Sequence, residues 1–174
     1  MAGDRASTGF PGTGFPGTGP RAADKTGGVT VVPSVAVTGQ PFKTATSFSS
    51  KMKGKQWEAQ ALAQPTSAIK AGDTLLASFY IRSTSPASGS TVDFNFQDGA
   101  PPYKITSAAI LKLTSKWQKV SMPFAAKNTY DGKGKKWMIA FQMGSMPQTI
   151  QVANFSIVDY GKSKTVGSLP KAGV

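Results

Sequence analysis

Apolar and polar residues alternate along much of the chain, most clearly between residues 75 and 97. In 75–82, and again in 91–97, the residues of one face are apolar and most of those on the other are polar. Successive side chains of a β-strand point to opposite sides, so this period of two predicts strands with one face in a core. The predicted inner residues are Leu75, Ala77, Phe79, Ile81, Val92, Phe94 and Phe96, and the predicted outer residues are Leu76, Ser78, Tyr80, Arg82, Asp93, Asn95 and Gln97.

Similar short segments, separated by turns that contain Gly, Pro or Ser, continue to residue 160. Pro33 marks the first of them as an edge strand or a bulge, because proline cannot donate to a strand ladder. No segment has the period of a helix. Many strands between turns predict an all-β fold, an antiparallel β-sandwich (jelly roll), over residues 28–161. The further predicted strands are 29–37, 42–48, 56–63, 103–113, 116–124, 137–143 and 148–160.

The first 27 residues have a different character. Phe-Pro-Gly-Thr-Gly occurs twice in succession, over residues 10–19. Such a segment cannot bury enough apolar surface to fold alone. We therefore expect residues 1–27 to form an N-terminal arm, which is either flexible or ordered by docking on a neighbouring subunit. Its assembly residues would be Phe10, Pro11, Phe15 and Pro16, and residues 162–174 are predicted to form a short basic tail.

The composition argues against an enzyme. The chain has no Cys and no His, so disulfides, thiolate metal sites and the ordinary Ser–His triad are excluded. Glycoside hydrolysis needs a pair of carboxylates, and the chain has only eight acidic residues. Glu58 and Asp93 are the only pair that the strand pattern places on one face. We expect no catalytic residues.

The net charge of +12 points to anionic partners. Only three of the 20 basic residues are Arg, and Arg rather than Lys supplies the bidentate fork that reads bases and phosphates. Lysines gather instead at the predicted turns 51–55 and 133–136, while the N-terminal arm is nearly neutral. The pattern favours an acidic polysaccharide over nucleic acid. No apolar run is long enough for a membrane-spanning helix.

Four segments carry a resemblance to a known family. Residues 71–83 (AGDTLLASFYIRS), 116–124 (KWQKVSMPF), 141–161 (FQMGSMPQTIQVANFSIVDYG) and 56–60 (QWEAQ) resemble the galactose-binding-like jelly roll of carbohydrate-binding modules. The similar modules are the xylanase-associated, CBM4/9-like type. The resemblance covers about residues 28–161 and implies a non-catalytic domain that binds polysaccharide.

Sugar binding needs aromatic faces for stacking and planar polar groups for pairs of hydroxyls. If the strands that carry such residues are neighbours in one sheet, their side chains share its outer face. The alternative is an ordinary solvated face with Trp57 in the core, and Trp117 and Trp137 are expected to be structural. The candidate carbohydrate-binding residues are Trp57, Gln60, Tyr80, Arg82, Asp93, Asn95, Gln97 and Gln142.

The resemblance also implies a structural calcium ion, which many relatives hold with acidic residues early in the last strand. This chain has Ala153 and Asn154 there, so only Asp159 would serve. Calcium takes about six to eight oxygen ligands, which one carboxylate does not supply. We expect no cofactor.

Two functions remain open from the sequence. The first is a polysaccharide-binding module that acts outside the cell, with a lysine-rich surface suited to acidic glycans. The second is a structural subunit that assembles into a filament, coat or matrix through its N-terminal arm and edge strands.

Overall fold

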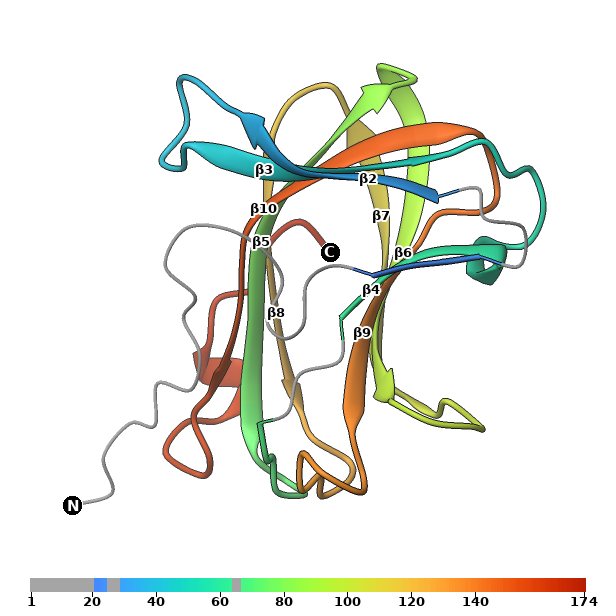
Figure 1. Ribbon diagram of the computed structural model, residues 1–174. Coiled ribbons are helices and arrows are strands. Elements are labelled where there is room, and N and C mark those ends of the chain that lie inside the picture. The colour runs from blue at the N-terminus through green and yellow to red at the C-terminus, as the bar shows by residue number, and fades with distance from the viewer. Residues whose placement is uncertain (1–20, 25–28, 64–66) are drawn as a thin grey trace.

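The computed structural model describes residues 21–24, 29–63 and 67–174, which form two packed β-sheets (Figure 1). Sheet A has the strand order β1-β4-β9-β6-β7, and sheet B has the order β2-β3-β10-β5-β8. Every strand pair in both sheets is antiparallel. The predicted all-β antiparallel sandwich is therefore confirmed. The strands are β1 (Arg21–Asp24), β2 (Val29–Ala36), β3 (Thr44–Ser50), β4 (Ala59–Ala63), β5 (Thr74–Ser85), β6 (Ser88–Asp98), β7 (Ile105–Thr114), β8 (Gln118–Ala125), β9 (Trp137–Gln142) and β10 (Gln148–Asp159), with 3-10 turns η1 (Gln56–Glu58) and η2 (Val166–Ser168).

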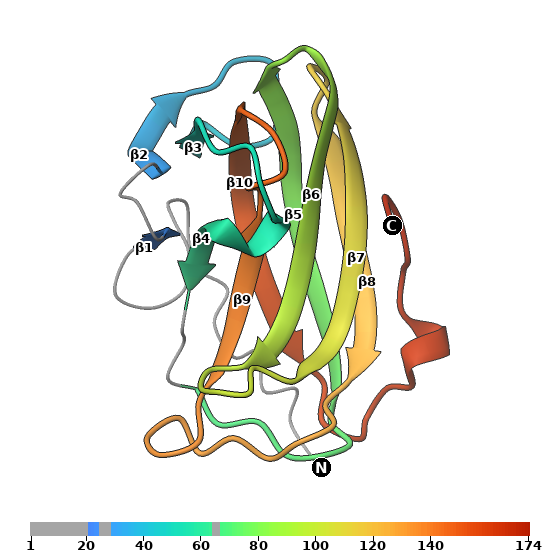
Figure 2. The same cartoon turned by 90° about the vertical axis from the view of Figure 1, so that its right-hand side faces the viewer.

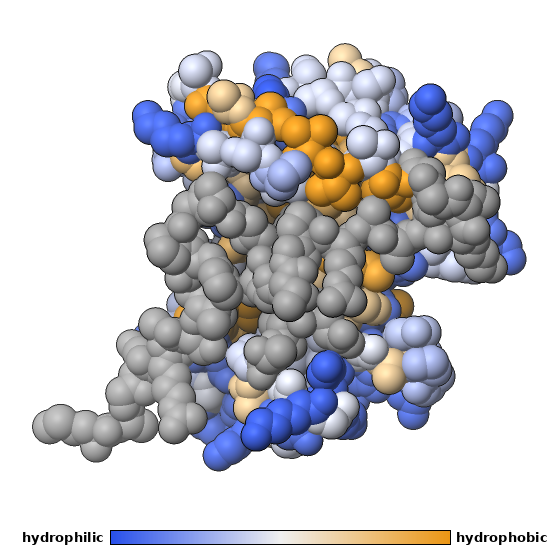
Figure 3. All heavy atoms as spheres, in the orientation of Figure 1, coloured by the Kyte–Doolittle hydropathy of each residue, from blue (hydrophilic) through white to orange (hydrophobic). Residues whose placement is uncertain are grey.

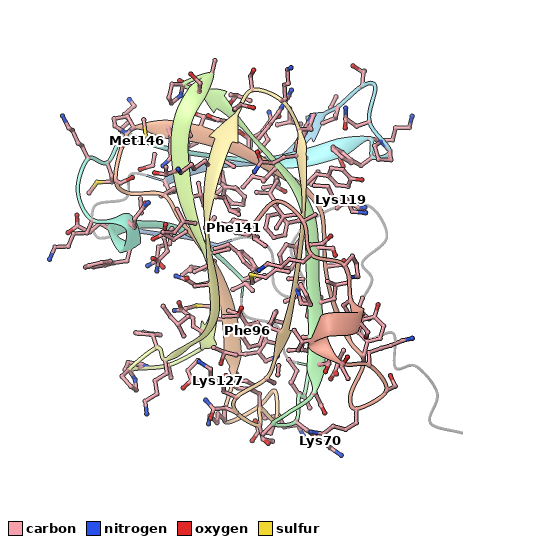
Figure 4. All side chains as sticks on the ribbon, turned by 180° about the vertical axis from the view of Figure 1, so that it is seen from behind. Lys70, Phe96, Lys119, Lys127, Phe141 and Met146 are labelled. Atoms are coloured by element: carbon pink, nitrogen blue, oxygen red, sulfur yellow. The ribbon has the colours of Figure 1, made fainter. Side chains whose placement is uncertain are left out.

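Aromatic rings from both sheets meet in the core. The Phe79 ring of β5 lies 5.0 Å from Phe94 of β6 and 5.1 Å from Phe141 of β9, so it joins sheet B to sheet A. Phe96 stacks on Trp137 at 5.1 Å nearer the other end of the sandwich. Figure 4 labels Phe96 and Phe141 in the space between the sheets. The inward faces predicted for β5 and β6 are confirmed, because their apolar residues are fully buried.

The two edge strands of sheet B, β8 and β2, differ in what covers them. The C-terminal tail lies along β8, where Ser121 and Ala172 exchange two backbone hydrogen bonds of 2.9 and 3.0 Å (Figure 2). The predicted basic tail is thus docked and covers one edge of sheet B. At the other edge, β2 pairs with β3 through a register shift between Val32 and Val35, as Pro33 predicts. Figure 3 shows apolar residues gathered over β2, where Val32 is 47% exposed.

Some element boundaries differ from the prediction. The sheet begins before residue 28, because Arg21–Asp24 already pairs with β4. Gln56–Glu58 forms the turn η1 rather than the start of a strand, and the Glu58 carboxylate accepts a hydrogen bond from the Lys55 backbone N–H. Phe42 lies before β3 and packs on Tyr80 outside sheet B, so it does not share a face with Phe48.

Phe10, Pro11, Phe15 and Pro16 lie outside the described residues, and their assembly role stays a prediction. In the part of the chain that the structure describes, no helix has both the length and the hydrophobicity needed to cross a bilayer.

We expect Phe79→Ala to lower the free energy of unfolding by about 3–5 kcal/mol, because it leaves a cavity where the two sheets meet. For a chain of this size, the loss corresponds to a fall in Tm of about 10 °C or more. Thermal unfolding measures it. Ile110→Ala is the control, because this side chain is 70% exposed and its loss should cost less than about 0.5 kcal/mol. Equal shifts in the two variants would contradict the assignment of the core.

Candidate functional site

The outer face of sheet A brings together several of the predicted site residues. Gln60 of β4 pairs with Gln142 of β9, which pairs with Asp93 of β6, which in turn pairs with Ile110 of β7. Residues opposite one another in an antiparallel sheet point to the same side. Because Gln60, Gln142 and Asp93 are only partly buried, this row presents two amides and a carboxylate to solvent. We call Gln60, Gln142 and Asp93 the polar row.

Hydrogen bonds fix the orientation of the polar row. Gln142 Nε2 donates to Gln60 Oε1 at 3.2 Å, and Gln60 Nε2 donates to the backbone carbonyl of Trp57 at 2.8 Å. Gln56 Nε2 lies 3.4 Å from Asp93 Oδ1, so η1 is tied to both ends of the row. Side chains that are held in this way lose little further freedom when a ligand binds.

Trp57 stands beside the polar row on η1. Its side chain is 53% exposed, and Lys55 Nζ lies 5.3 Å from the ring centroid. The alternative of a core Trp57 is therefore wrong. An exposed indole next to oriented amides supplies both kinds of group that a sugar ring needs, an apolar face and paired hydrogen-bonding groups.

The backbone around Gly144 holds η1 in place. Gly144 N donates to the Gln56 carbonyl at 2.9 Å, and Gly54 N donates to the Gly144 carbonyl at 2.9 Å. A Cβ on Gly144 would lie 2.5 Å from the Lys55 carbonyl oxygen and 2.8 Å from the Ala59 nitrogen. Only glycine allows this approach, because both neighbours are backbone atoms. The sequence signal for it was a glycine directly after a strand, in Phe-Gln-Met-Gly.

Two other predicted residues on this face are much less accessible. Asn95 and Gln97 of β6 point outward from sheet A, as the alternation predicts, but they are only 3% and 5% exposed. They flank Ala140 and Met138 of β9, both of which are buried as well. In this structure, Asn95 and Gln97 do not present open hydrogen-bonding groups.

Tyr80 and Arg82 lie on a different surface. Their strand, β5, belongs to sheet B, so they occupy the outer face on the opposite side of the sandwich from the polar row. The prediction of one shared face for all eight residues is therefore wrong. Tyr80 packs against Phe42 with ring centroids 4.9 Å apart, and Arg82 donates from Nε to Gln151 Oε1 at 2.9 Å. Sequence alternation assigns a face to each strand but does not say which strands are neighbours.

Glu58, Asp93 and Asp159 each accept a hydrogen bond from a different partner. Glu58 accepts the Lys55 backbone N–H, whereas Asp93 faces Gln56. Asp159 Oδ1 accepts a hydrogen bond of 2.8 Å from the Gly161 backbone N–H. Among the described residues, no three His, Cys, Asp or Glu side chains lie close enough to share a metal ion.

Comparison with known proteins identifies the fold. No family model and no curated protein matches the chain. A solved CBM4 structure superposes with a TM-score of 0.61 and 20% identity, over 76% of this chain and 94% of that chain. The second N-terminal cellulose-binding domain of Cellulomonas fimi β-1,4-glucanase C gives a TM-score of 0.57 and 16% identity, over 91% and 98%. Arabinose-bound MgGH51 α-L-arabinofuranosidase gives 0.57 and 14%, over 80% of this chain and 23% of the enzyme.

The chain thus has the jelly roll of carbohydrate-binding modules. The structural resemblance inferred from its sequence is confirmed. Sequence identities this low show a shared fold and nothing more. The same fold makes up a minor part of the larger arabinofuranosidase.

Partial burial raises the pKa of the Asp93 carboxyl above its ordinary value of 3.8. The folded protein therefore holds this proton more tightly than the unfolded chain does, so stability is lost as the pH rises through the folded-state pKa. We expect Asp93→Asn to stabilise the protein at pH 7, and to have little effect below pH 3.8. Solvent screening keeps the gain below about 1 kcal/mol. Thermal unfolding at pH 3 and pH 7 measures it.

Asp131→Asn is the matched control, with the opposite sign. The backbone N–H of Lys133 donates to the Asp131 carboxylate at 2.8 Å and lowers the pKa of that carboxyl. The charged form is favoured in the folded state, so this variant should lose stability at pH 7, and the loss should shrink as the pH falls below 3.8 and through the folded-state pKa. A destabilised Asp93→Asn variant at pH 7 would contradict the assignment.

Proposed function

We propose that this chain is a non-catalytic polysaccharide-binding module whose binding surface is the polar row together with Trp57. The observation that carries the proposal is the exposed Trp57 indole on η1, the turn that is hydrogen-bonded to Gln60 and to Asp93 of the polar row. The apolar face of a sugar ring would stack on the indole, while the amides and the carboxylate would bind neighbouring hydroxyls. Neither interaction requires a reacting group.

The surroundings of the polar row support an extended ligand. The row crosses the adjacent strands β4, β9 and β6. Ile110 of β7 lies opposite Asp93 at the end of the row, and its side chain is 70% exposed. A chain of sugars would pass from the Trp57 indole over the amides toward this apolar side chain. Lys55 and Lys112 are exposed near the two ends of the row, so the surface also suits a glycan that carries negative charge.

The proposal includes action outside the cell and no enzyme activity of the chain's own. Two of the similar structures are carbohydrate-binding modules, one of which is described as cellulose-binding. The third is an arabinofuranosidase that contains the fold as one part, which is consistent with a module that serves a catalytic partner.

Trp57→Ala should weaken retention on the preferred polysaccharide at least tenfold, which corresponds to about 1.4 kcal/mol of lost stacking. Affinity electrophoresis in gels with cellulose derivatives, xylan, mixed-linkage glucan or polygalacturonate measures it. Trp57→Phe is the control, because it keeps an aromatic face and should retain part of the affinity. The exposed position of Trp57 makes an unchanged Tm the expected result for both variants.

If the unaltered protein is not retained on any of these polysaccharides at low salt, the proposal is wrong. Equal retention of Trp57→Ala and the unaltered protein would show that the binding surface does not include Trp57.

A second function, self-assembly as a structural subunit, is favoured by one observation. The edge strand β2 presents an apolar band that includes exposed Val32 (Figure 3). Unpaired strand edges with apolar side chains join readily to other chains. If this function holds, light scattering of the full chain at high concentration will show oligomers that Val32→Lys disrupts. Lysine at this exposed edge should leave the fold intact, and a monomeric full chain would exclude the alternative.

A further inference from the structure

The outer face of sheet B contains a hollow that the proposed function does not use. Its volume is about 460 Å³, and its walls come from the end of β2 with the loop after it, from β5, and from the turn between β7 and β8. The lining side chains with polar groups are Thr38, Gln40, Arg82, Ser115, Lys116 and Trp117. Because β5 and β8 belong to sheet B, the hollow lies across the sandwich from Trp57 and the polar row.

The Arg82 guanidinium is held in place from two sides. Its Nε donates to Gln151 Oε1 at 2.9 Å, and its central carbon lies 4.7 Å from the Trp117 ring centroid. Trp117 in turn meets the Phe42 ring edge-on at 4.9 Å. An arginine fixed through Nε and a ring stack keeps its two terminal nitrogens in a defined fork.

The charge of Arg82 is not balanced by any carboxylate of the described residues. Among the residues that the structure describes, no carboxylate forms an ion pair with Arg82, and no Asp or Glu lines the hollow. Arg82 is nevertheless half-buried, and Lys116 adds a second positive charge at the same hollow. A partly desolvated guanidinium gains most from an anion with two oxygens, which accept parallel hydrogen bonds from the fork.

We propose that this hollow binds an oxyanion carried on a sugar ring, namely the carboxylate of a uronic acid or a sulfate ester. The Arg82 fork would bind two oxygens of the anion, and Lys116 would add charge. The Gln40 amide and the hydroxyls of Thr38 and Ser115 are suited to the ring hydroxyls. The site is separate from the polar row, so it does not depend on the function proposed for sheet A.

The size and the lining of the hollow favour a sugar over other polyanions. A free phosphate or sulfate would need only the two cations and would leave most of the volume empty. A nucleic-acid backbone would need a row of basic groups, whereas the hollow has two. The test therefore compares inorganic sulfate and a short oligonucleotide with the sugars.

The first experiment titrates the full chain with trigalacturonate and with galactose 6-sulfate, and follows the protein by NMR. We expect saturable shifts of the Arg82 Nε–H, the Trp117 indole N–H and the Gln40 amide with at least one of the two ligands, and none with neutral galactose. Isothermal titration calorimetry gives the affinity. This measurement needs no variant, so a folding defect cannot obscure it.

Variants then distinguish binding by the Arg82 guanidinium from a general attraction to positive charge. Arg82→Lys and Arg82→Gln should each weaken binding at least tenfold, and Lys116→Gln about threefold. Lys133→Gln is the matched control, because it removes the same charge from the exposed turn at the opposite end of the molecule (Figure 1). Lys133→Gln should leave the affinity unchanged.

Several results would overturn the proposal. They are an absence of shifts with both sugars, full affinity in Arg82→Lys, or an equal loss in Lys133→Gln. Loss of binding in Trp57→Ala would assign the acidic sugar to the polar row instead. Inorganic sulfate or a short oligonucleotide that binds as tightly as the sugars would show that the hollow recognises charge alone.

Discussion

The packing of aromatic rings between the two sheets is the interaction on which the rest of the molecule depends. Phe79 of sheet B contacts Phe94 and Phe141 of sheet A, and each of these rings is almost completely buried. Because Phe79 belongs to one sheet and the other two rings to the opposite sheet, their contacts fix the two sheets face to face. The outer residues of the same strands are then held in rigid positions, and they include Asp93 and Gln142 of the polar row and Arg82 of the hollow.

The two outer faces differ in how they use side chains. On sheet A, two amides and a carboxylate form a row whose two ends, Gln60 and Asp93, are hydrogen-bonded to the turn η1 that carries an exposed indole. On sheet B, the rings of Phe42, Tyr80 and Trp117, from the loop after β2, from β5 and from the turn before β8, build a small second cluster that supports Arg82. The first arrangement suits sugar hydroxyls and the second suits an anion. The same sandwich thus offers two chemically distinct surfaces.

Period-two alternation predicted the inner and outer faces of β5 and β6 correctly, because burial of alternate side chains is a local property of a strand. It did not predict that β5 and β6 lie in different sheets, because consecutive strands joined by a short turn are usually neighbours in one sheet. Because of this sheet assignment, Tyr80 and Arg82 lie on the opposite outer face from Gln60 and Gln142. Trp57 was predicted as an outer binding residue and is exposed, but the sequence pattern placed it on a strand, whereas it lies on the short 3-10 turn η1.

The close approach at Gly144 has a consequence for how such a surface can change. Because backbone atoms on both sides fix η1, and its side-chain hydrogen bonds come from Gln56 and Glu58, its position does not depend on the side chain of residue 57. The identity of residue 57 can therefore vary without moving the turn. Ligand preference can diverge among copies of this sandwich through substitutions at η1 alone, while residue 144 must remain glycine in all of them.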